Sequence, residues 1–266
     1  MSKELVSVIM ATYNEDRFLA ESIESVLNQT YRDLELLITD DCSTNKAVID
    51  ILEDFKKKDE RVKTFYLTEN QGAGVARNKS IEKARGRYIA FCDSDDRWKP
   101  EKIERQLALM NEKESCLCYS AYYTCDEDDN LTGVVAAPRK VTLKSMARDN
   151  KIGCLTGIYD TKPYGKFFMP LMRKRQDWGL FLEILKKSGR GFGITEPLAY
   201  YRKRRMSIST NKISLLRYNA SVYQQILGFS KIKSYFQLIF VFLPTYILKV
   251  FGNKIRSIEW KIRQKG

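Results

Sequence analysis

The sequence contains no histidine, and this absence narrows the chemistry that its 266 residues can perform. Without an imidazole, the chain has no Ser-His or Cys-His nucleophile, no histidine acid-base catalyst and no His-ligated zinc. Carboxylates must therefore accept or donate any proton that a reaction moves near neutral pH. The 33 Asp and Glu residues are where catalytic groups should be sought.

The cysteine pattern and the first residues lead to an expectation about the cellular compartment. Six Cys, at positions 42, 92, 116, 118, 125 and 154, form no Cys-x-x-Cys pair, and several lie in apolar runs. We expect buried free thiols in a reducing compartment. The first ten residues lack the charged segment and long apolar core of a signal peptide, so we expect the catalytic part to face the cytoplasm.

Short apolar runs alternate with helical patterns over the first hundred residues. The expected strands are residues 6–11, 34–39, 62–67 and 88–92, and the expected helices are residues 18–27, 48–55 and 75–84. This alternation predicts βαβ crossovers and an α/β fold with a mostly parallel, Rossmann-like sheet flanked by helices. In such a sheet a ligand binds beyond the carboxyl ends of the strands.

Four residues, Asp93, Ser94, Asp95 and Asp96, follow the last of these strands directly. Carboxylates this close repel one another, which raises the pKa of at least one of them unless a cation is present. A divalent ion binds hard carboxylate oxygens and commonly bridges to nucleotide phosphates. The tetrad therefore predicts a site for Mg²⁺ or Mn²⁺ and a phosphate. A solvated turn with an Asp that caps the next helix is the alternative.

The other strand ends reach the same edge of the sheet. The first strand leads into Ala11, Tyr13 and Glu15, and the second leads into Asp41. The Tyr13 ring can stack on a base or pack on the following helix. The Asp41 carboxylate can accept the imide N–H of a uracil or close a local turn. Arg77, one turn inside the third helix, is either a salt-bridge partner or a diphosphate contact.

The net charge of +13 is concentrated at the C-terminal end. Residues 231–266 hold eight Lys or Arg and one Glu, which gives +7 and leaves +6 for the other 230 residues. Within this tail, residues 235–252 are apolar and aromatic but interrupted by Gln237, Pro244 and Lys249. A spanning helix needs ~20 nearly uninterrupted apolar residues. We therefore expect a Pro-kinked, basic amphipathic segment on an anionic membrane surface. A helix packed on the core is the alternative.

Several stretches together resemble one known family. They are residues 6–14 (VSVIMATYN), 25–31 (SVLNQTY), 36–44 (LLITDDCST), 76–78 (ARN), 86–96 (GRYIAFCDSDD) and 98–100 (WKP). This combination resembles the nucleotide-sugar half of family 2 glycosyltransferases of the GT-A fold, including bacterial transferases of O-antigen and capsule assembly. The resemblance is dense over residues 5–107 and thinner beyond. The family usually has Gly where this chain has Cys42.

The resemblance implies a donor site for a UDP-sugar. In the family, the position of Asp41 recognises the base, usually uracil, and that of Tyr13 packs on it. Asp93 and Asp95 match the positions that hold the ribose-diphosphate and the divalent metal, so they are the predicted metal ligands. The predicted donor-binding residues are Ala11, Tyr13, Glu15, Asp41, Arg77, Asp93, Ser94 and Arg202.

Asp177 is the predicted catalytic base. It lies at the start of an apolar-periodic helix, where taken alone it would be a helix N-cap. In the resembling family, an acidic residue followed by an aromatic one, here Trp178, is the general base at this location. Family 2 enzymes invert configuration in one displacement, for which a carboxylate must accept the proton of the acceptor hydroxyl.

The resemblance also divides the chain into three parts. Residues 1–107 are the expected nucleotide-sugar half, residues 108–213 the acceptor half with the base and a closing loop, and residues 214–266 a basic, aromatic helical region. The run from Tyr201 to Ser209 resembles the loop that closes over the donor diphosphate and contains the cationic residues 202–205. Residues 173–175 are a second cationic cluster. The acidic run 126–129 is expected to be a solvated hairpin turn.

These observations predict an inverting, metal-dependent glycosyltransferase. It would move a sugar from a UDP-sugar to a polyprenyl-diphosphate-linked glycan acceptor in surface-polysaccharide biosynthesis, at the cytoplasmic face of the inner membrane. Nucleic acid is not an expected partner, because no motif for it is present. A nucleotidyltransferase is one alternative, although it usually carries a Gly-rich loop with a basic residue after the first strand. A non-catalytic, membrane-bound nucleotide-sugar sensor or scaffold is the other.

Overall fold

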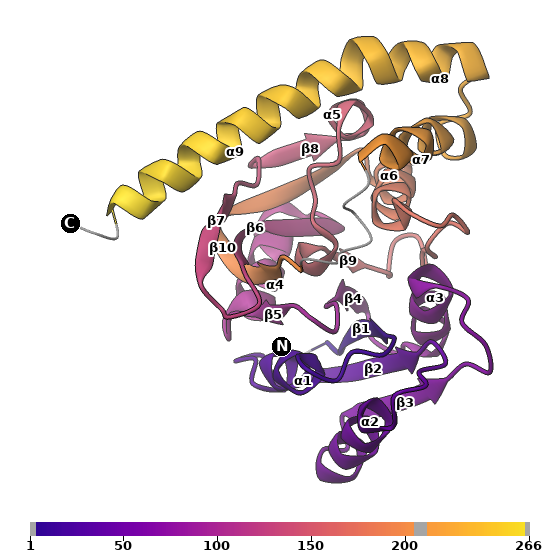
Figure 1. The fold of residues 1–266 in the computed structure, drawn as a ribbon, viewed down its shortest axis with the longest axis vertical. Helices are drawn as coiled ribbons and strands as arrows, with labels where there is room; N and C mark the ends of the chain where they lie inside the picture. The colour runs from indigo at the N-terminus through magenta and orange to yellow at the C-terminus, as the bar shows by residue number, and fades with distance from the viewer. Residues whose placement is uncertain (1–3, 205–211, 264–266) are drawn as a thin grey trace.

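The computed structural model describes residues 4–204 and 212–263, which contain one mixed sheet with helices on both faces (Figure 1). The strands are β1 (Val6–Thr12), β2 (Leu34–Asp40), β3 (Val62–Tyr66), β4 (Tyr88–Phe91), β5 (Arg97–Trp98), β6 (Leu117–Cys125), β7 (Leu131–Val135), β8 (Lys140–Thr142), β9 (Ile158–Asp160) and β10 (Arg190–Arg202). The α-helices are α1 (Leu19–Leu27), α2 (Lys46–Lys58), α3 (Ala73–Lys83), α4 (Lys102–Lys113), α5 (Leu143–Arg148), α6 (Gln176–Ser188), α7 (Lys212–Gln225), α8 (Lys231–Gln237) and α9 (Leu243–Arg263).

The sheet confirms the predicted fold class. Its strand order is β3-β2-β1-β4-β9-β6-β10-β5, with β7 paired to β6 and β8 paired to β10. Strands β1 to β4 are all parallel, while β9 runs antiparallel between β4 and β6. Parallel strands joined by helices bring their carboxyl ends to one edge of the sheet, so the loops after β1, β2, β3 and β4 lie together.

The expected elements of the first hundred residues all form. Helix α2 is longer than expected at both ends. The Asn45 side chain caps its N-terminus by accepting a hydrogen bond from the Ala47 N–H at 3.0 Å, and three Lys in its last turn complement the helix dipole. Hydrophobic periodicity alone misses these polar turns, because they bury almost no apolar surface.

Two hydrophobic clusters pack on opposite faces of the sheet. On one face, Val8, Met10 and Ile38 pack against α1, α2 and α4. On the other, Ile9 and Phe91 pack against α3 and α6. Alternate residues of one strand enter different clusters because strand side chains point to the two faces in turn. Burial on both faces explains why the strands are continuous apolar runs.

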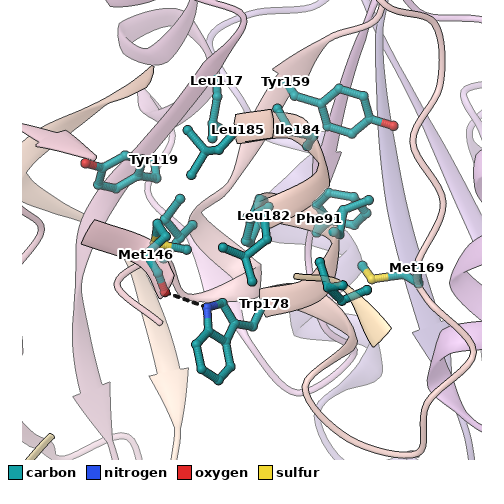
Figure 2. Close-up of a cluster of buried hydrophobic side chains, with 14 of the residues drawn as sticks. Phe91, Leu117, Tyr119, Met146, Tyr159, Met169, Trp178, Leu182, Ile184 and Leu185 are labelled. Atoms are coloured by element: carbon teal, nitrogen blue, oxygen red, sulfur yellow. Dashed lines mark hydrogen bonds between the residues drawn. The ribbon is translucent and has the colours of Figure 1, made fainter. Parts of the chain in front are cut away.

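Helix α6 is anchored in the second cluster by Trp178 (Figure 2). The Trp178 indole N–H donates to the Met146 carbonyl oxygen at 2.8 Å, which satisfies its one polar group in the core. The next turn of α6 places Phe181 edge-on to Phe91 of β4, with ring centroids 6.4 Å apart. The start of α6 is therefore fixed against the strand that leads into the acidic tetrad.

Two further expectations are confirmed. All six Cys are free thiols, and Cys92, Cys118 and Cys125 are buried. The acidic run 126–129 forms the turn between β6 and β7, where the Asp126 carboxylate accepts hydrogen bonds from the backbone N–H groups of Asp128 and Asn130. The carboxylate thus closes a local turn.

The C-terminal tail differs from the expected interrupted segment. Helix α8, a π-helical turn (Leu238–Phe242) and α9 follow one another without a break, and residues 231–260 have the length and composition to cross a membrane. The helical run continues through Pro244 because this residue is second in α9, directly after the π turn, where a missing N–H is tolerated. Only 11% of the apolar window is buried, so the run is not a core helix.

One side of this helical run contacts the domain and the other side is exposed, as its course along the edge of the molecule shows (Figure 1). On the contact side, Phe242 is buried, the Ser257 hydroxyl accepts a hydrogen bond from the Val134 N–H, and Trp260 packs on Tyr123. The exposed side is apolar. It comprises Ile232, Tyr235, Phe236, Ile239, Phe240, Ile247, Leu248, Val250, Phe251, Ile255, Ile258 and Ile262.

Lys102, at the start of α4, carries its ammonium group into the core. Its ammonium is fully buried, donates to the Gln106 side chain at 2.8 Å and lies 3.7 Å from the centre of the Trp98 ring. Burial lowers the pKa of Lys102 to about 7. The unfolded chain therefore holds one more proton than the folded protein between about pH 7 and the ordinary lysine pKa of 10.5, so stability rises with pH in that window.

We predict that Lys102→Met removes this pH dependence. Between pH 7 and pH 9, the free energy of unfolding of the wild type should rise by about 2 kcal/mol relative to that of the variant. Urea denaturation of both proteins at the two pH values measures this difference, and titrations common to both proteins cancel. Parallel pH profiles would mean that Lys102 is charged in the folded protein.

Candidate active site

A cavity of about 540 Å³ opens beyond the carboxyl ends of β1 and β4. This size is typical of small-molecule sites. Six of the predicted site residues line it: Ala11, Arg77, Asp93, Ser94, Asp95 and Asp177. These residues come from the end of β1, α3, the loop after β4 and the start of α6. The fold thus brings together residues that lie up to 166 positions apart in the sequence.

Arg77 of α3 joins two sides of this cavity. Its guanidinium pairs with the Asp93 carboxylate at 2.5 Å and lies close enough to Asp177 to interact with its charge. A Cβ at Gly74 would lie 2.6 Å from the Gln176 side-chain amide, so α3 and the start of α6 pass close together here. The Arg77 Nε is buried and has no hydrogen-bond partner among the described residues, which leaves a donor beside the cavity.

Asp95 lies in a crowded group of carboxylates. Burial, followed by the charges of Asp93 and Glu15, raises the pKa of Asp95 to about 6, against the opposing charge of Arg204. The neighbouring Asp96 points away from the cavity and accepts a hydrogen bond from the Arg202 N–H at 2.9 Å. Burial, followed by the charges of Asp95 and Asp93, also raises the pKa of Asp96 well above its ordinary value. The crowding predicted from the tetrad is therefore present in the fold.

The oxygens of Asp93 and Asp95 fit a hard divalent cation. Within residues 4–204 and 212–263, no three His, Cys, Asp or Glu side chains are grouped so as to hold a metal by themselves. A magnesium-like ion needs only one or two protein carboxylates when substrate phosphates and water supply its other ligands. Two cavity-lining carboxylates, one with a raised pKa, suit that kind of shared site.

The turn after β2 is built around Asp41. Its two carboxylate oxygens accept hydrogen bonds from the backbone N–H groups of Gln71 and Gly72, at 2.8 and 2.7 Å. Cys42 follows with a left-handed backbone, φ +63°, which explains why Gly is usual there. Asp41 is buried beside this cavity rather than in its wall, and its lone pairs are partly used. Base recognition by Asp41 therefore stays a prediction.

Tyr13 and Glu15 occupy the loop after β1, outside the cavity wall. The Tyr13 ring is half exposed, which leaves a face open for a planar group. Glu15 is buried, and its carboxylate accepts a hydrogen bond from the Phe18 N–H and pairs with Arg204. Glu15 thus fixes the loop before α1 and contributes negative charge near Asp95. Donor contacts by Tyr13 and Glu15 stay predictions.

Arg202, at the end of β10, lies behind the acidic loop. It is 2% exposed, and its guanidinium donates to Glu21, Asp129 and the Asp95 carbonyl oxygen. These contacts hold the loop that carries Asp95, and they leave Arg202 outside the cavity wall. Its contact with a donor diphosphate stays a prediction. Arg205 and the rest of the predicted closing loop, through residue 209, lie outside the described residues.

Asp177 is the second residue of α6, and Arg175 is the N-cap. The simple N-cap interpretation of Asp177 is therefore wrong, although the position in the first turn is favourable for an acidic side chain. The Asp177 Oδ2 accepts a hydrogen bond from the Asn150 side-chain amide at 3.0 Å. Within the described residues, no hydrogen bond engages the other Asp177 oxygen, and the residue lines the cavity, so its role as general base stays a prediction.

Sequence reasoning missed the wall beside Asp177. The loop residues Asn150 and Lys151 and the α9 residues Tyr246 and Lys249 line the same cavity. The Lys249 ammonium pairs with Asp149 at 2.8 Å and donates to the Asn150 carbonyl oxygen. No local pattern marks these residues, because a loop and a distant helix meet only in the folded chain. Of the cationic cluster before α6, Lys174 and Arg175 line the cavity, whereas Arg173 lines a separate hollow.

A Rossmann-like sheet with an acidic pair after β4, and a third carboxylate from a later helix in the same cavity, is the arrangement of the GT-A glycosyltransferases. The chain belongs to the family 2 glycosyltransferases, because the family model described as glycosyl transferase family 2 matches residues 7–178.

Named relatives agree with this membership. A Bacillus subtilis glycosyltransferase named for teichuronic acid biosynthesis, TuaG, is 41% identical over 84% of this chain and 89% of its own length. Two Escherichia coli enzymes, WfgD and WfaP, are named UDP-Glc:alpha-D-GlcNAc-diphosphoundecaprenol beta-1,3-glucosyltransferases. They are 35% and 36% identical over 82% and 84% of this chain, which covers 84% and 87% of their lengths.

Solved structures share the fold. The S. aureus TarS fragment crystallised with UDP-GlcNAc superposes with a TM-score of 0.67 at 21% identity, over 88% of this chain and 70% of that chain. The Pyrobaculum calidifontis mannosyltransferase PcManGT in complex with GDP-Man and Mn²⁺ superposes with a TM-score of 0.60 at 15% identity, over 86% of this chain and 66% of that chain. At these identities the likeness is one of fold.

We predict opposite effects of Asp95→Asn on stability and on metal response. The raised pKa of Asp95 means that its charge destabilises the metal-free protein above about pH 6 and ceases to do so as the pH falls toward the ordinary value of 3.8. At pH 7.5 without metal, the free energy of unfolding of the variant should therefore exceed that of the wild type by on the order of 1–3 kcal/mol, and its Tm should be higher. Mn²⁺ should raise the Tm of the wild type but not that of the variant.

Asp128→Asn is the matched control, because it removes one carboxylate from the exposed acidic turn instead. Its Tm should respond to Mn²⁺ as the wild type does. Differential scanning calorimetry of the three proteins, with EDTA and with Mn²⁺, checks both effects. A variant at Asp95 that is less stable in EDTA and still responds to Mn²⁺ would place the metal elsewhere.

Proposed function

We propose that this protein is an inverting, metal-dependent transferase that moves a hexose from a UDP-sugar to a polyprenyl-diphosphate-linked glycan in surface-polysaccharide biosynthesis. The observation that carries the proposal is a single cavity lined by Asp93, Asp95 and Asp177. The chain covers most of the lengths of WfgD and WfaP, whose names specify a UDP-sugar donor and a diphosphoundecaprenol acceptor.

Asp177 is the proposed general base. In the reaction, an acceptor hydroxyl attacks the anomeric carbon, the new C–O bond forms as the bond to the UDP oxygen breaks, and the hydroxyl proton passes to Asp177. The Asn150 amide holds one Asp177 oxygen, which leaves the other to receive the proton. Attack from the side opposite the leaving group inverts the configuration at that carbon.

The proposed donor end is formed by the cavity residues Ala11, Arg77, Asp93, Ser94 and Asp95. Tyr13 and Asp41 are proposed to contact the uracil of the nucleotide. Glu15 and Arg202 support the loops that carry these residues. A bound Mn²⁺ or Mg²⁺ would be held by Asp93 and Asp95 and would neutralise charge on the departing diphosphate. Arg77 keeps Asp93 in place through their ion pair. Residues 1–107 thus form the donor half and residues 108–213 the acceptor half.

Residues 214–266 are proposed to hold the enzyme on the cytoplasmic face of the inner membrane. A lipid-linked acceptor requires a protein at the membrane surface. The exposed apolar side of α8 and α9, with Lys254 and Arg256 exposed beside it, matches an acyl boundary with anionic headgroups. Contact of the other side with the domain favours a helix that lies along the membrane surface.

Asp177→Asn tests the catalytic assignment. The amide cannot accept the proton, so kcat for transfer from UDP-glucose to GlcNAc-diphosphoundecaprenol should fall by a factor on the order of 10²–10⁴. UDP affinity, measured by calorimetry, should change by less than about threefold, because the donor end is intact. Radiolabel transfer to lipid measures the rate.

Glu183→Gln is the control for this experiment, because it makes the same change on an exposed face of the same helix. It should keep the wild-type rate. A wild type that binds UDP but transfers no hexose from a panel of UDP-sugars to lipid-diphosphate acceptors would favour the non-catalytic sensor. Unchanged turnover in the Asp177 variant would place the base elsewhere.

The membrane assignment predicts that Leu248→Glu with Phe251→Glu lowers partition into phosphatidylglycerol vesicles by about tenfold or more. These side chains are 73% and 67% exposed, so the Tm should not change. Leu171→Glu with Phe168→Glu makes the same substitutions at exposed positions outside the tail and should bind as the wild type does. Vesicle cosedimentation measures the difference, and equal binding by both double variants would contradict the assignment.

A further inference from the structure

The cavity extends past Asp177 to a second group of cations, which the donor does not require. Lys151, Arg175 and Lys249 line this part, from the loop before β9, the start of α6 and helix α9. The contacts run in order from Asp93 to Arg77, then to Asp177, Asn150 and Lys249. The candidate base thus lies between a donor end and a separate basic end.

The cations of the basic end outnumber the carboxylates that pair with them. Asp149 pairs with Lys249, and the Arg175 guanidinium donates to the Asn219 side chain, an uncharged partner. Within the described part of the chain, no hydrogen bond or ion pair engages the half-buried Lys151 ammonium. Burial lowers the pKa of Lys151, and the charges of Lys249 and Arg148 act in the same direction, against Asp149. A bound anion would relieve this repulsion.

Helix α9 connects this basic end to the exposed apolar surface. Tyr246 and Lys249, three residues apart, face the cavity, while Leu248 and Phe251 on the same turns are exposed on the other side. One helix therefore offers a cation to the cavity and apolar side chains to the membrane. A molecule with an anionic head and a long apolar chain matches both sides.

We propose that Lys151 and Lys249, with Arg175, form a subsite for the diphosphate of the lipid-linked acceptor, and that α9 is one wall of it. This inference rests on the proposed function and adds the residues that recognise the acceptor. The diphosphate is held beyond Asp177, so that the first sugar of the acceptor reaches the base, and the polyprenyl chain leaves along α9 toward the lipid.

Direct binding tests the subsite without turnover. Farnesyl diphosphate is titrated into the full chain by calorimetry, with farnesol as the probe that lacks the diphosphate. Lys151→Gln should weaken farnesyl diphosphate binding about tenfold, as expected for one charge-assisted contact, and should leave farnesol binding unchanged. Lys187→Gln, which neutralises an exposed Lys in the last turn of α6 outside the cavity, should behave as the wild type.

Three outcomes overturn the subsite. Equal affinity of the wild type and Lys151→Gln would show that Lys151 contacts no phosphate. Displacement of farnesyl diphosphate by UDP would show one shared diphosphate site at the donor end. Displacement by excess dihexanoyl-phosphatidylglycerol would assign the cations to membrane headgroups. A wild type that binds farnesyl diphosphate through Lys151 but transfers no sugar would contradict the proposed function and leave the subsite standing.

Turnover supplies an independent readout of the same variant. With GlcNAc-diphosphoundecaprenol, Lys151→Gln should raise the acceptor KM about tenfold and leave the KM of the UDP-sugar unchanged. With octyl-GlcNAc, which has no phosphate, the variant and the wild type should have the same KM. A loss of equal size with both acceptors would mean that Lys151 only supports the loop that holds Asn150.

Discussion

The ion pair between Arg77 and Asp93 is the interaction on which the arrangement of the cavity depends. Arg77 comes from α3, Asp93 follows β4, and the same guanidinium lies near Asp177 of α6. One cation thus ties the donor half of the sheet to the helix that carries the candidate base. It offsets the charge of one carboxylate, but Asp95 remains crowded, so the site retains a demand for a further cation.

The cavity is held in shape by residues that do not line it. Arg202 donates hydrogen bonds to Glu21, Asp129 and the Asp95 carbonyl oxygen. Asp41 accepts hydrogen bonds from two backbone N–H groups of the turn before α3. Such supports matter because reacting groups need accurate positions before substrate arrives. The crowded carboxylates of the acidic loop lower the free energy of unfolding, as is common where residues are selected for binding rather than for stability.

The sequence was sufficient to predict the sheet of β1 to β4 and the residues at its carboxyl edge, because apolar periodicity and chain order determine both. It pointed to Asp177 only through resemblance, since a helix N-cap explained the same residue; the structure places Asp177 in the cavity, and its role as base stays a prediction. Asn150, Lys151 and Lys249 were not predictable, because their meeting depends on how α9 crosses the domain. The interruptions at Pro244 and Lys249 predicted a broken tail. Instead, a π turn precedes Pro244, and Lys249 forms a partly buried ion pair, so the helical run continues through both.

The central claim is that one cavity performs a single displacement, with Asp177 and the donor diphosphate on opposite sides of the anomeric carbon. The anomeric configuration of the product tests this most directly. Proton NMR of the glycan formed from UDP-α-glucose should show the large three-bond coupling between H1 and H2 that marks a β-gluco linkage, which is inversion. An α-linked product, which is retention, would contradict the account, because the new bond would then lie on the face of the sugar from which the diphosphate leaves.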